Sequence, residues 1–484
     1  MVDMNTLATI DSDNAVLASF PGSARIVDVR LQQVLEYSDI CKKVAAGVAE
    51  ISTLGLPPGM PVVIGQKSAL DTLLSLFATW QAGHPAVVVN PKLRALEQAN
   101  VLAFTQAVAW LGPFHGNLPR KGSQTATKRK SSAPGHNDAA LVLMTSGTTG
   151  IPKGIVHTIH SLEARLALNV AHIGSHVLAR SLCVLPAYFG HGLIGNCLTP
   201  LAAGATLVLW DSPEVSHIAN LGDIIDEHDI SFMSSVPSFW NLAMRLGQPP
   251  KSPLRRLHIG SAPLSYEQWE QIAEWNGTKD VYNMFGTTET ANWIAGGALR
   301  DADGRDGYVG NCWGGRLAVL DDKGVVRTHG RGEVLIQSSS MMVEYLNAPD
   351  KTDEAFHGTW FRSGDIGKLS VTGQLQLVGR IKSEINRGGI KILAEEIDML
   401  LERHRDIVEA CTFGMDDPVS GEIIAAAIVL ADHIESNTAG IKKWCRDTVR
   451  PEAVPAKLFV VSEIPKNDRG KVVRAQVKQM FAGR

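Results

Sequence analysis

The sequence is poor in cysteine and has no apolar run that approaches the roughly 18 residues needed to span a bilayer. Its 6 cysteines are scattered along 484 residues without a Cys-x-x-Cys pair, which argues against a disulfide framework or a zinc site. The first residues, MVDMNTLATIDSDN, lack the basic and apolar segments of a signal peptide. These absences lead us to expect a cytoplasmic protein without an integral membrane segment.

Neither sign of charge dominates. The chain has 46 Lys and Arg against 49 Asp and Glu, a formal net charge of −3 at pH 7. Because dedicated nucleic-acid binders usually carry a strongly basic face, we expect no nucleic-acid partner. Two short basic clusters do occur within residues 112–137, among Ser, Thr, Gly and Gln. We interpret this stretch as a solvated surface loop, with a phosphate-steering patch as the alternative.

Strand-like and helical patterns alternate along most of the chain. Helical periodicity covers residues 30–54, 68–83, 158–173, 214–228, 237–246 and 265–276, and β-branched runs cover 86–89, 141–143, 206–209 and 257–259. Such alternation predicts βαβ units, and so an α/β protein with a large N-terminal domain of mainly parallel sheets flanked by helices. Residues 307–379 favour a β-rich subdomain, and the last hundred or so residues a small C-terminal α+β domain.

The strongest local motif is the segment 141–154, LVLMTSGTTGIPKG, in which an apolar strand runs into hydroxyl residues, glycines and a lysine. Glycines let backbone N–H groups approach a polyanion, hydroxyls donate to phosphate oxygens, and lysine adds a positive charge. The segment is not a Walker A loop, because two residues separate its last spacer glycine from the lysine. The alternative is a generic turn. The candidate phosphate contacts are Thr145, Ser146, Gly147, Thr148, Thr149, Gly150 and Lys153.

Five further segments follow in a fixed order. They are GSAPL at 260–264, NMFGTTE at 283–289, WFRSGD at 360–365, GRIK with RGG at 379–389, and PKNDRGKVVR at 465–474. Together with the phosphate loop, they resemble the adenylate-forming superfamily, which includes acyl- and aryl-CoA synthetases, adenylation domains of peptide synthetases, and beetle luciferases. The resemblance covers about residues 140 to 474, whereas the upstream region fits only in length and alternation.

The resemblance implies a nucleotide site. Phe285 would offer a flat apolar face to adenine, with core packing as the alternative. Thr288 would reach the α-phosphate, and the hard oxygen of Glu289 would hold Mg²⁺. Asp365, helped by Arg380, would accept hydrogen bonds from the ribose hydroxyls. The remaining residues of these motifs would line the nucleotide: Gly260, Ser261, Ala262, Gly286 and Thr287.

The resemblance also implies a mobile C-terminal domain. Lys471 would bridge the substrate carboxylate and the α-phosphate, neutralising two anions that otherwise repel. Lys382 would be the hinge, where many family members have Asp, and rotation about it would exchange Lys471 for Gly388 and Gly389 at a tunnel for coenzyme A. The expected units are therefore an N-terminal domain over 1–379, a hinge over 380–382 and a mobile domain over 383–484.

The sequence identifies the acid pocket less clearly than the nucleotide site. Candidates by proximity to the motifs are Phe189, His191, Val236, Phe239, Ser261 and Trp293. His191 has two interpretations, a packed and hydrogen-bonded histidine or a substrate contact. The Phe189 segment lacks the Asp that amino-acid activators place there, so a non-amino acid is favoured. His157 and His160 could bind a metal at i, i+3, but without a third ligand we interpret them as structural.

The implied reaction joins a carboxylic acid and ATP to give acyl-AMP and pyrophosphate, and then transfers the acyl group to coenzyme A. One alternative keeps the first step but loads a separate acyl carrier protein. Another is a non-catalytic nucleotide-binding homologue. The expected substrates and cofactors are the acid, ATP, Mg²⁺ and coenzyme A, and the oligomeric state, monomer or homodimer, stays open.

Overall fold

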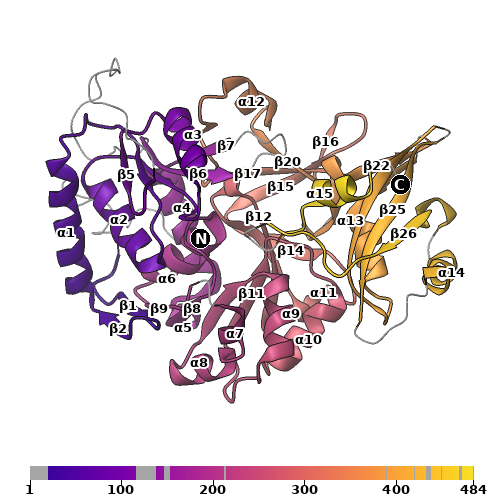
Figure 1. The fold of residues 1–484 in the computed structure, drawn as a ribbon, viewed down its shortest axis with the longest axis horizontal. Coiled ribbons are helices and arrows are strands. Elements are labelled where there is room, and N and C mark those ends of the chain that lie inside the picture. Colours follow the sequence, from indigo (N-terminus) through magenta and orange to yellow (C-terminus); the bar gives the residue numbers. More distant parts are fainter. Residues whose placement is uncertain are drawn as a thin grey trace.

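The structure, a computed structural model, describes residues 20–115, 138–145, 153–211, 214–388, 390–418, 420–431, 438–448, 450–467 and 471–482. Three sheets and the helices that cover them form a large N-terminal domain and a smaller C-terminal domain (Figure 1). The sequence predicts this mixed α/β class. Among the described helices, none is both long and apolar enough to cross a membrane.

The largest sheet has 15 strands and runs through the N-terminal domain. One half is mainly parallel, and the other half, beyond β12, is antiparallel and contains the β-rich subdomain predicted from the sequence. In spatial order the strands are β16 (Val326–Arg327), β15 (Gly315–Leu320), β17 (Gly330–Ser338), β20 (Trp360–Leu369), β21 (Leu375–Arg380), β14 (Tyr308–Cys312), β13 (Trp293–Ala298), β12 (Val281–Gly286), β11 (Arg256–Gly260), β10 (Phe232–Ser235), β8 (Arg180–Cys183), β9 (Thr206–Leu209), β1 (Arg25–Asp28) and β2 (Gln33–Leu35), with β19 (Phe356–His357) beside β20.

A second sheet of 6 strands contains both ends of the predicted phosphate loop. Its order is β18 (Glu344–Tyr345), β7 (Lys153–Thr158), β6 (Ala139–Thr145), β4 (Ala86–Val88), β3 (Val62–Ile64) and β5 (Ala109–Leu111). Strands β6 and β7 are antiparallel, with Thr145 opposite Lys153. The residues that join these two strand ends, 146–152, lie outside the described residues, as do 116–137 of the basic stretch.

Helix boundaries follow local signals in part. The helix α2 (Ala69–Gln81) begins as predicted, because the Ser68 hydroxyl accepts the N–H of Asp71 at 3.0 Å. The helix expected over 30–54 was wrong at its start, since residues 33–35 form β2 and α1 (Tyr37–Thr53) follows. The other N-terminal helices are α3 (Ala95–Thr105), α4 (Ile159–Ile173), α5 (Ser175–Leu178), a π-helix η1 (His191–Leu198), α6 (Thr199–Ala202), α7 (Val215–Ile218), α8 (Leu221–Glu227), α9 (Pro237–Leu246), α10 (Tyr266–Trp275), a 3₁₀ turn η2 (Thr288–Thr290), α11 (Leu299–Ala302) and α12 (Pro349–Glu354).

The C-terminal domain packs helices on both faces of a 5-stranded sheet. The helices are α13 (Ala394–Leu401), α14 (Thr438–Thr448) and α15 (Arg474–Met480), with 3₁₀ turns η3 (Ile381–Ser383) and η4 (Pro451–Ala453). Side chains of a strand alternate between the two faces of a sheet, so Ile424 and Ala426 of β25 pack in one core with α13 and α14. Ala425 and Ala427 of the same strand pack in a second core with α15. The strands are β23 (Ile390–Leu393), β22 (Glu384–Arg387), β25 (Gly421–Leu430), β24 (Ile407–Asp417) and β26 (Lys457–Val460).

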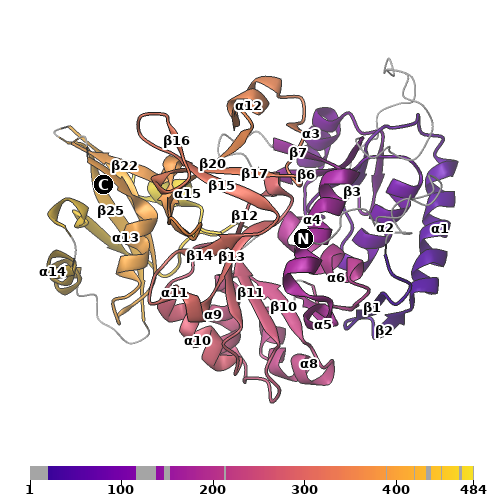
Figure 2. The same ribbon diagram turned by 180° about the vertical axis from the view of Figure 1, so that it is seen from behind.

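The two domains meet along β21 and α13. In both views α15 lies on the side of the C-terminal domain that faces the N-terminal domain (Figure 1 and Figure 2). Arg403, which follows α13, forms an ion pair with Asp306 of the N-terminal domain. The carboxylate of Asp306 also accepts the backbone N–H of Tyr266 at 2.7 Å, which fixes it against α10.

Candidate active site

Asp365 and Arg380 face each other where the last strand of the N-terminal domain ends. They are paired residues of β20 and β21, and the Nε of Arg380 lies 2.6 Å from Oδ1 of Asp365. The preceding Gly364 has a φ of 74°, a conformation that L side chains rarely adopt. The Asp365 carboxylate raises the pKa of Arg380. Arg380 occupies one of the two carboxylate oxygens, so the pair retains lone pairs that could accept a ribose diol.

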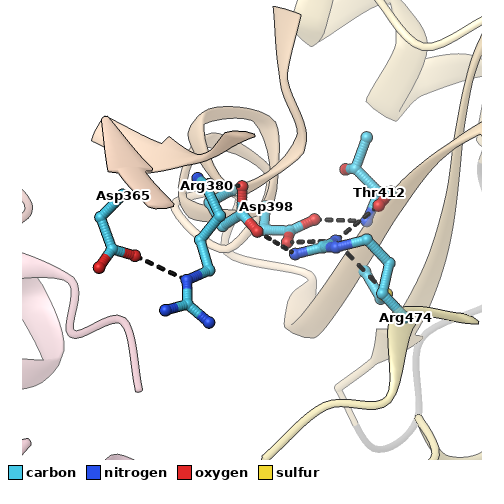
Figure 3. A network of polar contacts seen from close by, with 7 residues as sticks. Asp365, Arg380, Asp398, Thr412 and Arg474 are labelled. Carbon is cyan, nitrogen blue, oxygen red and sulfur yellow. Dashed lines mark hydrogen bonds and ion pairs between the residues drawn. The ribbon is translucent and has the colours of Figure 1, made fainter. Parts of the chain in front are cut away.

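A polar network continues from Arg380 into the C-terminal domain (Figure 3). The backbone N–H of Arg380 donates to Oε2 of Glu395 at 3.4 Å, and Oε1 of Glu395 lies 3.0 Å from the guanidinium of Arg474. Arg474 also pairs with Asp398 at 2.9 Å and donates to the carbonyl of Thr412 at 2.5 Å. The first residue of α15, Arg474, is thus linked through Glu395 to Arg380, in the predicted hinge.

Lys471 lies three residues before Arg474, in a tight hairpin. Lys466 and Val472 form a β-bridge, the backbone N–H of Lys471 donates to Oδ1 of Asn467 at 3.0 Å, and Asn467 returns its N–H to the carbonyl of Lys471 at 2.9 Å. Residues 468–470 lie outside the described residues. The network of Arg474 therefore fixes the base of the segment that carries Lys471.

The Thr287–Glu289 segment forms a rigid turn after β12. Gly286 is required there, because a Cβ would lie 2.2 Å from the carbonyl oxygen of Asn292. His157 supports the turn, with its Nε2 2.8 Å from the carbonyl oxygen of Thr288. Burial lowers the pKa of His157 to about 4, so the ring is neutral and Nε2–H donates. The structural interpretation of His157 fits this contact better than a metal site.

Glu289 belongs to a second cluster with Tyr345 and Lys153. The Tyr345 hydroxyl donates to Oε1 of Glu289 at 2.7 Å, and Nζ of Lys153 lies 4.2 Å from the centre of the Tyr345 ring. Burial lowers the pKa of Lys153, Glu289 opposes that shift, and the positive charges of Lys382 and Lys351 add to it. Lys382 of the predicted hinge and Lys153 at the end of the predicted phosphate loop thus lie within electrostatic reach of each other. Among the described residues, no group of three or more His, Cys, Asp or Glu could hold a metal ion.

The remaining nucleotide candidates lie at strand ends in two sheets. Gly260 ends β11 opposite Met284 of the parallel strand β12, so Ser261 and Ala262 emerge beside the Phe285–Thr287 segment. Phe285 is buried in the core of the β-rich half. Thr145 and Lys153 mark the two ends of the phosphate loop, and Ser146, Gly147, Thr148, Thr149 and Gly150 lie outside the described residues.

The acid-pocket candidates lie in two core clusters, and the ring of His191 contacts both of them. Phe189, Val236 and Phe239 belong to the same core cluster, and the ring of Trp293 lies edge-on to His191 with the centroids 5.4 Å apart. His191 is buried and both of its ring nitrogens contact serine hydroxyls. The hydrogen-bonded interpretation of His191 therefore matches its contacts.

The hinge and tunnel candidates lie at the surface. Lys382 is exposed in the turn η3, directly after Arg380 and Ile381. Gly388 is exposed with a φ of 59°, and its N–H donates to the carbonyl of Ser420 at 2.6 Å. Gly389 lies outside the described residues. Apart from its chain neighbours, no described residue lies within 4 Å of the position that a Cβ on Gly388 would take.

Comparison with known proteins identifies the family. The model of the family described as "AMP-binding enzyme" matches residues 17–346. This chain belongs to the AMP-binding enzyme family. The model described as "AMP-binding enzyme C-terminal domain" matches residues 396–471, which agrees with the separate C-terminal domain of the fold.

Several relatives of this AMP-binding enzyme carry the name CoA ligase. The protein called "Probable CoA ligase CCL9" from Humulus lupulus is 33% identical over 71% of this chain, and the match spans only 66% of that protein. "Sulfoacetate--CoA ligase" from Cupriavidus necator is 30% identical over 83% of this chain and 77% of its own length. The solved structure of ATP-bound MatB from Rhodopseudomonas palustris has a TM-score of 0.85 at 20% identity, covering 98% of this chain and 99% of MatB. At 20% identity, the similarity to MatB is evidence of a shared fold only.

Proposed function

We propose that this AMP-binding enzyme is an AMP-forming acid–thiol ligase. It converts a non-amino carboxylic acid and ATP to acyl-AMP and pyrophosphate, and then transfers the acyl group to coenzyme A with release of AMP. The observation that carries the proposal is the network from Asp365 through Arg380 and Glu395 to Arg474, because it ties the Lys471 segment to the ribose pair. The CoA ligases among its relatives support the choice of acceptor.

In the first step the acid carboxylate attacks the α-phosphorus and pyrophosphate leaves, so no covalent enzyme intermediate is needed. The chain's part is to hold two anions together and offset their charge. Lys471 supplies a positive charge between them, and Thr288 donates to the α-phosphate. Glu289 could hold Mg²⁺, since this ion usually binds one or two carboxylates plus substrate phosphates. Glu289 fits this kind of binding, because the Tyr345 hydroxyl contacts only one of the two Glu289 carboxylate oxygens.

In the second step the C-terminal domain turns about residues 380–382. The turn withdraws Lys471 and brings Gly388 and Gly389 to the site, where residues without side chains let the pantetheine arm pass close to the backbone. The N-terminal domain then extends over 1–379 and the mobile domain over 383–484. The exposed Gly388 and the network at Arg474 fit the orientation of the first step.

Two assays test this proposal on the purified chain. Pyrophosphate release is measured with ATP and a panel of aryl, alicyclic, short-chain and long-chain acids, and thioester formation with free coenzyme A is measured for each acid that responds. We expect acid-dependent pyrophosphate release followed by an acyl-CoA product. Adenylation without transfer to coenzyme A would favour a carrier-protein acceptor, and a complete lack of acid-dependent pyrophosphate release would favour a non-catalytic homologue.

A further inference from the structure

A chain of three hydrogen-bonded side chains runs from the interior to the edge of the sheet where the nucleotide and acid candidates meet. The Oγ of Ser234 lies 2.7 Å from Nε2 of His191, and Nδ1 of His191 lies 2.9 Å from Oγ of Ser261. Ser234 in β10 is fully buried, His191 is buried at the start of the π-helix η1, and Ser261 is exposed. The chain therefore connects a closed end with an open end.

The closed end fixes the direction of the protons. Burial lowers the pKa of His191 to about 3, so one ring nitrogen donates and the other accepts. The Ser234 hydroxyl has no other hydrogen-bond partner among the described residues, and a buried hydroxyl hydrogen without an acceptor is costly. Ser234 therefore donates to Nε2, and Nδ1–H donates to the Oγ of Ser261. The Ser261 hydrogen is then the one proton of the chain that points to no protein acceptor among the described residues.

The backbone of Ser261 supports a role at the open end. Ser261 has a φ of 68°, in the left-handed region that residues other than glycine rarely occupy. Strained residues of this kind gather at ligand sites, where the surroundings hold them in place. Here Nδ1–H of His191 anchors the side chain, and the residue directly follows the carboxyl end of β11. Backbone and side chain together set the direction of the hydroxyl.

The aromatic rings of Phe189 and Trp293, which lie against His191, are uncharged. Trp293 lies edge-on to His191 and also edge-on to the buried His258, with ring centroids 5.4 and 5.0 Å apart. Burial also lowers the pKa of His258 well below its usual value. Neither imidazole therefore carries a charge that could offset a second carboxylate or an ammonium group on the substrate. The surroundings favour an uncharged acceptor.

We propose that Ser261 donates its hydroxyl hydrogen to an uncharged oxygen in the acyl part of the acid, and that His191 and Ser234 position it. This inference rests on the proposed function and deepens it: the substrates are carboxylic acids that carry a keto, ether or hydroxyl oxygen, in preference to plain hydrocarbon acids. Ser261 contacts the substrate, whereas His191 and Ser234 act only through Ser261.

Matched pairs of acids that differ by one CH₂-to-oxygen exchange test the assignment. Suitable pairs are 3-phenylpropanoate with phenoxyacetate, pentanoate with ethoxyacetate, and cyclohexanecarboxylate with tetrahydropyran-4-carboxylate. For the wild type we expect kcat/KM for pyrophosphate release to favour the oxygen-bearing member of at least one pair by about tenfold, the size of one neutral hydrogen bond. Ser261→Ala should bring the ratio to about one. Because each ratio compares two acids at one ATP concentration, effects on the nucleotide side cancel.

The buried end provides a readout that a merely structural role would not give. Ser234→Ala removes the hydrogen bond that holds Nε2, so the His191 ring and with it the Ser261 hydroxyl lose their fixed orientation, and the preference falls toward that of Ser261→Ala. Ser234→Thr keeps a hydroxyl and should keep the preference, and Ser252→Ala, at an exposed site, should leave every ratio unchanged. Turnover of both acids with ratios that Ser261→Ala or Ser234→Ala does not change would overturn the inference. No pyrophosphate release with any acid would instead count against the proposed function.

Discussion

Arg380 joins two domains through Asp365: its side chain lies 2.6 Å from the Asp365 carboxylate, while its backbone N–H reaches Glu395 in the first turn of α13. Arg380 is the last residue of β21, so the proposed ribose contact lies where the chain leaves the N-terminal sheet. A nucleotide bound at Asp365 would therefore act directly on Arg380, in the proposed hinge.

Asp365→Asn removes the charge that Arg380 faces and one strong acceptor for the ribose. We expect the KM for ATP to rise by about tenfold or more, because hydrogen bonds to charged groups contribute on the order of 1.5–3 kcal/mol. The KM for the acid should change little. Steady-state kinetics with each substrate varied in turn measure both. Asp322→Asn, at an exposed carboxylate, is the control, and an equal rise in both KM values would contradict the ribose role.

Lys471→Ala should lower adenylation by at least about 100-fold, since a single preorganised charge at a developing anion has effects of this size. Thioester formation from supplied acyl-AMP should be largely retained, because in the proposed rotation Lys471 leaves the site before that step. Both half-reactions are followed separately by pyrophosphate release and by acyl-CoA formation. Lys368→Ala, on an exposed strand position, is the control. Equal loss of both half-reactions would argue against the rotation.

Lys382→Pro should impair the second half-reaction more than the first. Proline fixes its own φ and restricts the preceding Ile381, so the turn η3 can no longer absorb the torsion changes of a hinge. Lys382→Ala keeps a flexible backbone and should resemble the wild type in the ratio of the two rates. Similar defects in both steps for the proline variant would place the hinge elsewhere.

Stability should depend on pH through Glu402. Burial raises the pKa of Glu402 to about 8, and the neighbouring Asp398 carboxylate adds to the shift. The folded state thus holds a proton that the unfolded state releases near pH 4.5, so stability is lost as pH rises from about 4.5 to 8. Glu402→Gln should raise Tm relative to the wild type by a few degrees at pH 9 and hardly at pH 4.5. Thermal unfolding of this variant and of Glu463→Gln, an exposed control, measures the difference. A Tm difference that does not grow with pH would refute it.

Local signals predicted parts of the fold well. The start of α2 depends on Ser68 and Asp71, which are three residues apart, so the sequence carries the whole signal. The start of α1 does not depend on neighbours alone, because β2 pairs with β1, and β1 pairs with β9 far along the chain. Helical periodicity over residues 30–54 could not reveal that pairing.

The sequence likewise predicted only part of the candidate site. Motifs identified Asp365, Arg380 and Glu289 as candidates, because each lies in a short segment with recognisable spacing. Spacing gave no signal for Tyr345 beside Glu289 or Glu395 beside Arg474, since these contacts join residues 56 and 79 positions apart. The Ser234 partner of His191 was missed for the same reason, at a separation of 43.

Two contacts between the domains differ in kind. The proposed turn of the C-terminal domain would separate Arg403 from Asp306, an ion pair whose arginine is half exposed, and break the long hydrogen bond between Arg380 and Glu395. Because the Arg403 side chain is half exposed, salt weakens this pair in part, although Asp306 is largely buried. The enzyme should therefore behave as an ionic-strength-sensitive switch, in which added KCl speeds thioester formation relative to adenylation. In Arg403→Gln, the rate of thioester formation relative to adenylation should no longer change with the KCl concentration. Parallel assays of the two half-reactions would reveal this.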